Sequence, residues 1–286
     1  MRIKKFIKLS ILIPLFSAHA QNGHILEFNT KTEPIDKGSI KQTEIGMQIF
    51  KNISIDNALK NTFKYKSTTI TDEIENYLME NYSSNYSSTH FNNFINVFEL
   101  THQFSQKTKL NVSFEPTVNF EQSISIADVT ILGGIEISQI LGKNNSVELG
   151  IKRMTVFGKP QIMPTVSFNH QFNKNAYLKL GFPNSALSCS SSSRDSFSLR
   201  NDFSGSINNL SSSIIADNKS ISKVGFSQME TTLQYERNID NSWFVNFIGG
   251  YSTRKEFKFW NENSTTEINQ ALKNGSIFSI SIKYKL

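Results

Sequence analysis

Apolar and polar residues alternate with a period of two through most of this chain. Between Lys109 and Phe120 every even position is apolar or proline, and every odd position is polar. The segment 278–286 repeats the pattern, with its apolar residues on even positions and serine or lysine between them. A strand sends successive side chains to opposite faces, so each segment has one apolar and one polar face. The sequence therefore predicts an all-β protein.

We expect twelve strands from residue 60 onward, joined alternately by short turns and by connections that include three long ones. The expected strands are 60–70, 93–104, 107–120, 126–141, 145–156, 161–172, 175–182, 185–191, 195–206, 222–237, 241–254 and 275–286. The three long connections are 71–92, 207–221 and 255–274. Short turns at one end and longer loops at the other are typical of a transmembrane β-barrel. The predicted fold is an antiparallel transmembrane β-barrel of about 12 strands (range 10–14), with one short helix or loop insertion near 71–92.

The domain organisation that we expect has a barrel at 60–286 and an N-terminal segment at 21–59 that is partly strand. Residues 42–54 are strand-like and would make thirteen strands alone. Pairing them with residues 24–29 would give fourteen. Bacterial single-chain barrels have an even number of strands, and twelve is preferred here.

Residues 1–20 have the three parts of a secretory signal peptide. Four basic residues open the chain, an apolar run follows at 9–18, and small residues stand at Ala18 and Ala20. The run is too short to span a bilayer as a helix. We expect cleavage before Gln21 and export from the cytoplasm. Without these residues 26 basic and 24 acidic side chains remain, so most of the formal charge of +6 is lost and nucleic acid is not an expected partner.

The alternation alone does not show which face of the sheet is exposed to water. In a membrane barrel the apolar row faces lipid, whereas in a soluble lipid-binding barrel it faces inward. The export signal, strands of ten or more residues and aromatic residues near strand ends favour the membrane barrel. We therefore expect the cell outer membrane as the location and its lipid as a partner. A soluble periplasmic or secreted lipid-binding barrel is the alternative.

Two stretches of the sequence resemble known outer-membrane proteins. The ending FSISIKYKL looks like the C-terminal strand that marks such proteins for the barrel-assembly machinery, with Tyr284 and Leu286 as the signal residues. Leu286 stands where phenylalanine is usual. The stretch 175–205, with its LGFP sequence, resembles an uncharacterised Bacteroidetes-type outer-membrane β-barrel family. The resemblance covers about 60–286 and implies an outer-membrane location, without an established activity or catalytic residues.

The chain has little that suggests catalysis. No histidine has metal-ligand spacing, and Cys189 has no cysteine partner. His102 and Ser105 are the one local pair of the kind a hydrolase needs, and they fall at an expected tight turn. No phosphate-binding glycine loop is present. We expect no enzyme activity, no catalytic or metal site and no cofactor.

The expected functional surface is the inside of the barrel, where charges on the polar rows would face the lumen. These are Glu99, Lys109, Glu115, Glu148, Lys152, Glu230, Glu236, Lys283 and Lys285. About eight strands give a filled interior and 16–18 give an open channel, so twelve predict a narrow or plugged pore. The first hypothesis is a narrow passive channel or transport-associated pore. The second is a closed-lumen structural or binding barrel that acts through its outer loops.

Overall fold

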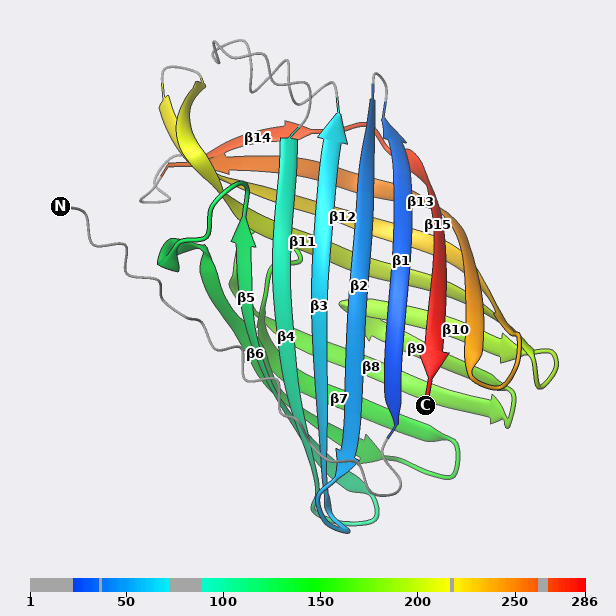
Figure 1. Ribbon diagram of the computed structural model, residues 1–286. Coiled ribbons are helices and arrows are strands. Elements are labelled where there is room, and N and C mark those ends of the chain that lie inside the picture. The colour runs from blue at the N-terminus through cyan, green and yellow to red at the C-terminus, as the bar shows by residue number, and fades with distance from the viewer. Residues whose placement is uncertain (1–22, 36–37, 72–88, 217–218, 262–266) are drawn as a thin grey trace.

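The computed structural model describes residues 23–35, 38–71, 89–216, 219–261 and 267–286 as one sheet of fifteen strands (Figure 1). The strands are β1 (His24–Ile35), β2 (Gly38–Asn52), β3 (Asn57–Thr71), β4 (Thr89–Gln103), β5 (Thr108–Phe120), β6 (Val129–Ile140), β7 (Asn145–Met154), β8 (Gln161–Asn173), β9 (Ala176–Phe182), β10 (Asn184–Ser190), β11 (Asp195–Ala216), β12 (Lys219–Asn238), β13 (Trp243–Trp260), β14 (Glu267–Ala271) and β15 (Gly275–Lys285). A single 3₁₀ turn, η1 (Ile126–Asp128), precedes β6. Among the described residues no helix is long and apolar enough to cross a membrane.

The sheet closes on itself as an antiparallel barrel. Each strand from β1 to β13 pairs with the next along the chain, β13 pairs with β15, and β15 pairs with β1. Fourteen strands therefore form the wall, and β14 is an extra strand that pairs with Glu256–Trp260 at the C-terminal end of β13. Closure leaves no sheet edge around the complete ring.

The expected count of about 12 strands is wrong, because the wall also contains β1 and β2. All twelve expected strands are present as β3–β13 and β15. Residues 24–52 add the two further strands, with β1 seated between β2 and β15. The expected boundary at residue 60 therefore does not coincide with an edge of the barrel, which runs from His24 to Lys285.

Two of the expected long loops are largely strand. Residues 207–216 extend β11 and residues 219–221 extend β12, so these strands form a long hairpin. In the stretch 255–274, β13 continues to Trp260 and β14 follows. The helix or loop expected near 71–92 falls mainly on residues outside the described ranges; residue 71 ends β3, and 89–92 begin β4.

The two faces of the wall have opposite polarity, and the apolar face is outside. Phe114 and Phe278 on the apolar rows are 50% and 60% exposed, whereas Thr117 and Ser281 on the polar rows are buried. A soluble lipid-binding barrel requires the reverse orientation, with its apolar rows inside. The barrel thus has an apolar outer surface and a polar interior.

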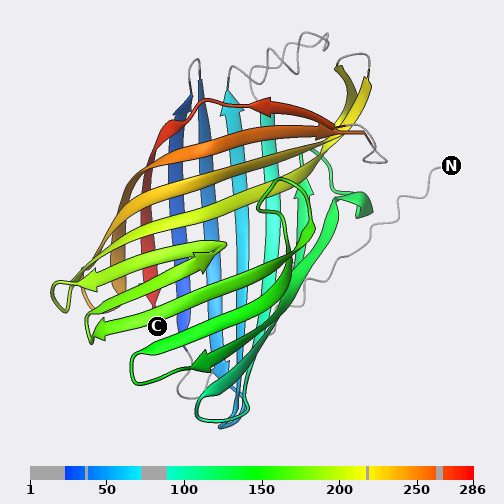
Figure 2. The same cartoon turned by 180° about the vertical axis from the view of Figure 1, so that it is seen from behind.

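The two ends of the barrel differ in circumference. The end that carries the short turns, here called the turn end, is ringed by all fourteen strands. At the other end, the loop end, β11 passes above the short strands β9 and β10 and meets β5 directly, where Asn209 pairs with Phe120 (Figure 2). The strands β6–β10 therefore take no part in the wall at this level. The lumen therefore narrows toward the loop end.

Candidate functional site: the barrel lumen

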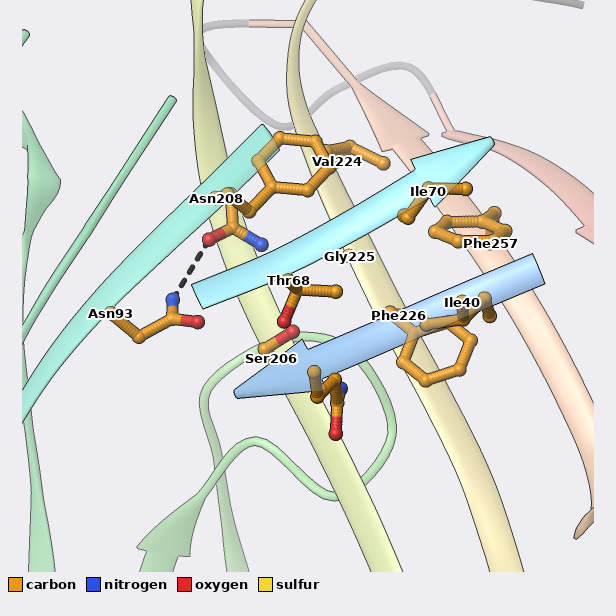
Figure 3. A pocket seen from close by; sticks show the side chains of 12 residues that line it. Ile40, Thr68, Ile70, Asn93, Ser206, Asn208, Val224, Gly225, Phe226 and Phe257 are labelled. Carbon is orange, nitrogen blue, oxygen red and sulfur yellow. Dashed lines mark hydrogen bonds between the residues drawn. The ribbon is translucent and has the colours of Figure 1, made fainter. Parts of the chain in front are cut away.

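Apolar side chains from opposite walls meet inside the narrow end of the barrel (Figure 3). We call this cluster the apolar seal; its members are Ile40, Ile70, Phe91, Ile221, Val224, Phe257 and Phe259, each at most 4% exposed. β2, β3 and β4 supply one side and β12 and β13 the other. In the ring β13 and β2 are separated by β15 and β1, so these contacts cross the lumen.

The small circumference explains why side chains fill this end. A barrel of about eight strands has an interior just wide enough for its own side chains. The wall around the seal lacks β6–β10, so fewer than fourteen strands surround it. The remaining cavity is about 20 Å³, which is room for one water molecule. At its edge the amide of Asn93 donates hydrogen bonds to Asn119 Oδ1 at 2.7 Å and to Asn208 Oδ1 at 2.9 Å.

A buried ion pair lies at the level of the seal. Glu33 is the register partner of Ile40, and its Oε1 lies 2.5 Å from Lys255 Nζ. Both side chains are 0% exposed. The single hydroxyl proton of Ser252 has two acceptors within reach, Glu33 Oε1 and the carbonyl oxygen of Gly275, the latter at 3.1 Å from Oγ. This pair ties β1 to β13 across the intervening β15.

A polar cavity of about 330 Å³ adjoins the seal, and Gln42 lines both. We call it the charged chamber. Its lining residues are Asn29, Lys31, Gln42, Glu44, Lys64, Lys66, Arg200, Asp202, Glu230, Thr232, Gln234, Ile248, Ile277 and Ser279. They come from β1, β2, β3, β11, β12, β13 and β15, so the chamber lies inside the barrel.

Ion pairs connect the walls of the charged chamber. Lys31 Nζ on β1 lies 2.8 Å from Glu230 Oε1 on β12, and these strands are not neighbours in the ring. Lys64 Nζ lies 2.8 Å from Glu44 Oε1 on the adjacent β2. Arg200 Nε lies 3.2 Å from Asp202 Oδ2. These pairs hold the carboxylates in place and neutralise them.

The nine charges expected in the lumen lie on the rows that alternate with the exposed apolar residues. Lys60 Nζ lies 2.6 Å from Glu99 Oε2, Lys179 Nζ lies 3.5 Å from Glu148 Oε2, and Lys152 pairs with Glu136. Glu236 accepts from Lys283 at 3.0 Å and lies 3.7 Å from Lys285. Lys109 and Glu115 make no ion pair with a described residue. Of the nine, only Glu230 lines the charged chamber.

Sequence reasoning missed the residues that define the lumen most closely. Lys31 and Glu33 fall in the segment that was not assigned to the barrel, although they alternate with Thr30 and Thr32 as strand residues do. Lys64 and Lys66 lie two positions apart in an expected strand, which signals a shared face. No local sequence pattern marks the residues of the apolar seal, because their contacts join strands that are far apart in the sequence.

The remaining candidate residues lie away from the lumen. Tyr284 pairs with Leu26 and Trp243 at the closing seam, and the backbone N–H of Leu286 donates to the carbonyl oxygen of His24 at 2.9 Å. His102 and His170 each hydrogen-bond an asparagine of the neighbouring strand. Within the described part of the chain no group of three or more His, Cys, Asp or Glu side chains could hold a metal ion.

The fold and lumen define the protein as a closed antiparallel β-barrel with an apolar exterior and a charged interior. A family model described as "Domain of unknown function (DUF6268)" matches residues 25–285, and the chain belongs to this family. No curated protein matches this chain.

Several solved barrels are similar to this chain. One is the Pseudomonas putida toluene transporter TodX, at 8% identity and a TM-score of 0.48, over 94% of this chain and 90% of that one. Another is the NanC porin, at 6% identity and a TM-score of 0.44, over 91% and 100% of the two chains. The KdgM porin has 7% identity and a TM-score of 0.38, over 90% and 98%.

Proposed function

We propose that this protein spans the outer membrane and forms a narrow, gated pathway for small hydrophilic solutes. The observation that carries the proposal is the charged chamber, which lies within a barrel of apolar exterior and is separated from the loop end by the apolar seal. A solute in the chamber is surrounded by ion pairs, amides and hydroxyl groups. Charged side chains of this kind line aqueous pathways through membranes.

The outer surface of the barrel supports this location. Strand residues such as Ile135 and Leu149 are more than half exposed, which is costly in water and favourable in lipid. The proposal includes export by the signal peptide 1–20 and assembly through the C-terminal strand with Tyr284 and Leu286. The Bacteroidetes-type relationship stays a prediction.

The apolar seal acts as the gate in this proposal. A hydrophobic constriction stops ions and polar solutes because they would have to shed their water. The seal is formed by contacts between the two walls, so separating β2, β3 and β4 from β12 and β13 opens it. The closed-lumen structural barrel is the second candidate. The apolar seal favours this candidate if the two walls never separate.

Single-channel recording in planar bilayers tests the proposal. We expect brief, infrequent openings of the wild type and steady conductance of the double variant Ile70→Ala, Phe257→Ala, which shortens the seal from both walls. The matched control is Phe278→Ala, Ile280→Ala, which makes similar truncations on the outer face and should behave as the wild type.

Heat-modifiable gel migration verifies that each variant is a folded barrel. Folded wild type and double variant that both fail to conduct would overturn the pathway in favour of the closed-lumen barrel. Equal, continuous conductance of the two would overturn the assignment of the gate.

A further inference from the structure

Cations outnumber carboxylates in the charged chamber. Its three carboxylates are those of Glu44, Asp202 and Glu230, and each has a basic partner within 3.2 Å. The fourth cation is Lys66, which also lines the chamber. No hydrogen bond or ion pair joins Lys66 to any residue that the structure describes. The chamber therefore has one more basic side chain than it has carboxylates, and Lys66 is the basic side chain outside the three ion pairs.

The surplus is a property of the local geometry. Glu44 is the register partner of Lys66 on β2, yet its carboxylate is bonded to Lys64 instead. Glu230, the other carboxylate of this part of the chamber, accepts from Lys31 at 2.8 Å, from Gln228 at 2.5 Å and from Ser204 at 3.3 Å. Both carboxylates are thus held by other donors. An ammonium group away from bulk water is costly unless an anion joins it.

We infer that Lys66 anchors a binding site for a small hydroxylated carboxylate, an inference that rests on the proposed function and names its solute class. The ammonium of Lys66 would hold the carboxylate. Asn29, Gln42 and Gln234 offer amide groups, and Thr232 and Ser279 offer hydroxyl groups, to hydroxyls of the same solute. A volume of about 330 Å³ falls within the range of small-molecule sites.

The charge balance favours a monoanion over a dianion such as a phosphate ester. One carboxylate neutralises the single surplus charge, whereas a dianion would leave a net negative charge among three fixed carboxylates. Phosphate is bound in a bidentate manner by the planar guanidinium group of arginine. Lys66 offers only a single ammonium group, and the guanidinium of Arg200 is already paired with Asp202.

Equilibrium binding in detergent tests the site without requiring conduction. The probes are D-gluconate, a hydroxylated carboxylate, and D-glucose, which is similar in size and uncharged, measured by isothermal titration calorimetry at low salt. We expect saturable binding of gluconate to the wild type and at least tenfold weaker binding of glucose. Lys66→Gln should weaken gluconate binding about tenfold or more, since a charge-assisted contact is lost.

Two further variants keep the result interpretable. Lys66→Arg retains the positive charge and should bind gluconate within about threefold of the wild type. Lys143→Gln makes the same charge change at an exposed position in the turn between β6 and β7 and should leave binding unchanged. An equal loss in Lys143→Gln and Lys66→Gln would overturn the site, because binding would then follow overall charge.

The two proposals fail in different ways. Absence of gluconate binding to a folded wild type overturns the site at Lys66, whatever the bilayer recordings give. Lys66-dependent binding by a barrel that never conducts supports the site and overturns the pathway. A higher affinity for inorganic phosphate than for gluconate would overturn the assignment of a carboxylate.

Discussion

At the scale of single residues, the interior of this barrel is organised by charge pairs. They range from partly exposed, as for Lys60 and Glu99, to fully buried, as for Glu33 and Lys255. A buried pair has lost its water on both sides, so removing one partner leaves an uncompensated charge. An exposed pair loses little, because water replaces the missing partner.

Removal of Lys255 should therefore destabilise the barrel strongly. We expect Lys255→Met to lower the free energy of unfolding by about 3–5 kcal/mol, measured by urea titration of the protein in phospholipid vesicles. The double variant Glu33→Leu, Lys255→Met should recover most of this loss, because no unpaired charge remains. Lys60→Met is the control and should cost at most about 1 kcal/mol. A similar loss in Lys60→Met and Lys255→Met would contradict the burial argument.

At the scale of elements, the loop 155–160 between β7 and β8 fills the place that the short strands leave beside β11. Thr155 Oγ1 donates to the carbonyl oxygen of Gly205 at 2.9 Å. The ring of Phe157 stacks on that of Phe182, with 6.2 Å between the ring centroids. The absence of a side chain at Gly205 and Gly225 permits this approach. A Cβ there would collide with the carbonyl oxygens of Thr155 and Gly158, respectively.

An alanine at position 205 should loosen this loop. We expect Gly205→Ala to cost about 1–3 kcal/mol and to speed amide hydrogen exchange within 155–160, since the carbonyl of Thr155 must move. Gly249→Ala is the matched control, because a Cβ at Gly249 has no atom within 4 Å. Unchanged exchange in Gly205→Ala would show that the loop is not held by this contact.

A strand could be predicted from the sequence where a local pattern of residues marks it. Twelve strands could be predicted because apolar residues recur at alternate positions along much of their length, most regularly in 109–120. β1 and β2 were underweighted, since threonines such as Thr30, Thr32 and Thr43 weaken their outer rows. The Ser- and Asn-rich stretch 207–216 has the composition of a loop, and its pairing with β12 overrides that preference. The charged chamber required the register between distant strands, which no local pattern contains.

At the scale of the whole molecule, the protein has its polarity reversed relative to a soluble barrel. Exposed apolar side chains such as Ile135, at 54%, sit mid-strand on the outer face. Replacing an exposed apolar residue with a charge is nearly neutral in a soluble protein. In a lipid-facing position near the bilayer midplane it costs about 2–4 kcal/mol.

Ile135→Arg separates these two environments. We expect it to lower the free energy of unfolding in vesicles by about 2–4 kcal/mol and to reduce the yield of heat-modifiable barrel. The control Ile55→Arg changes a 99% exposed residue in the turn between β2 and β3, outside the span, and should have no effect. Full stability of Ile135→Arg would place the outer face in water and reject the membrane proposal.

The seam between β1 and β15 sets the order in which the wall can form. It joins residues 25–32 to residues 278–285, the most distant segments of the described chain. Neighbouring hairpins can form as they emerge, but the ring has two open edges until β15 is available, and long-range pairing of this kind is slow. Each open edge is a template for pairing with other chains. The polypeptide therefore needs protection from aggregation until β15 has paired with β1. Folding that stops at any earlier strand leaves an open barrel with exposed, aggregation-prone strand edges.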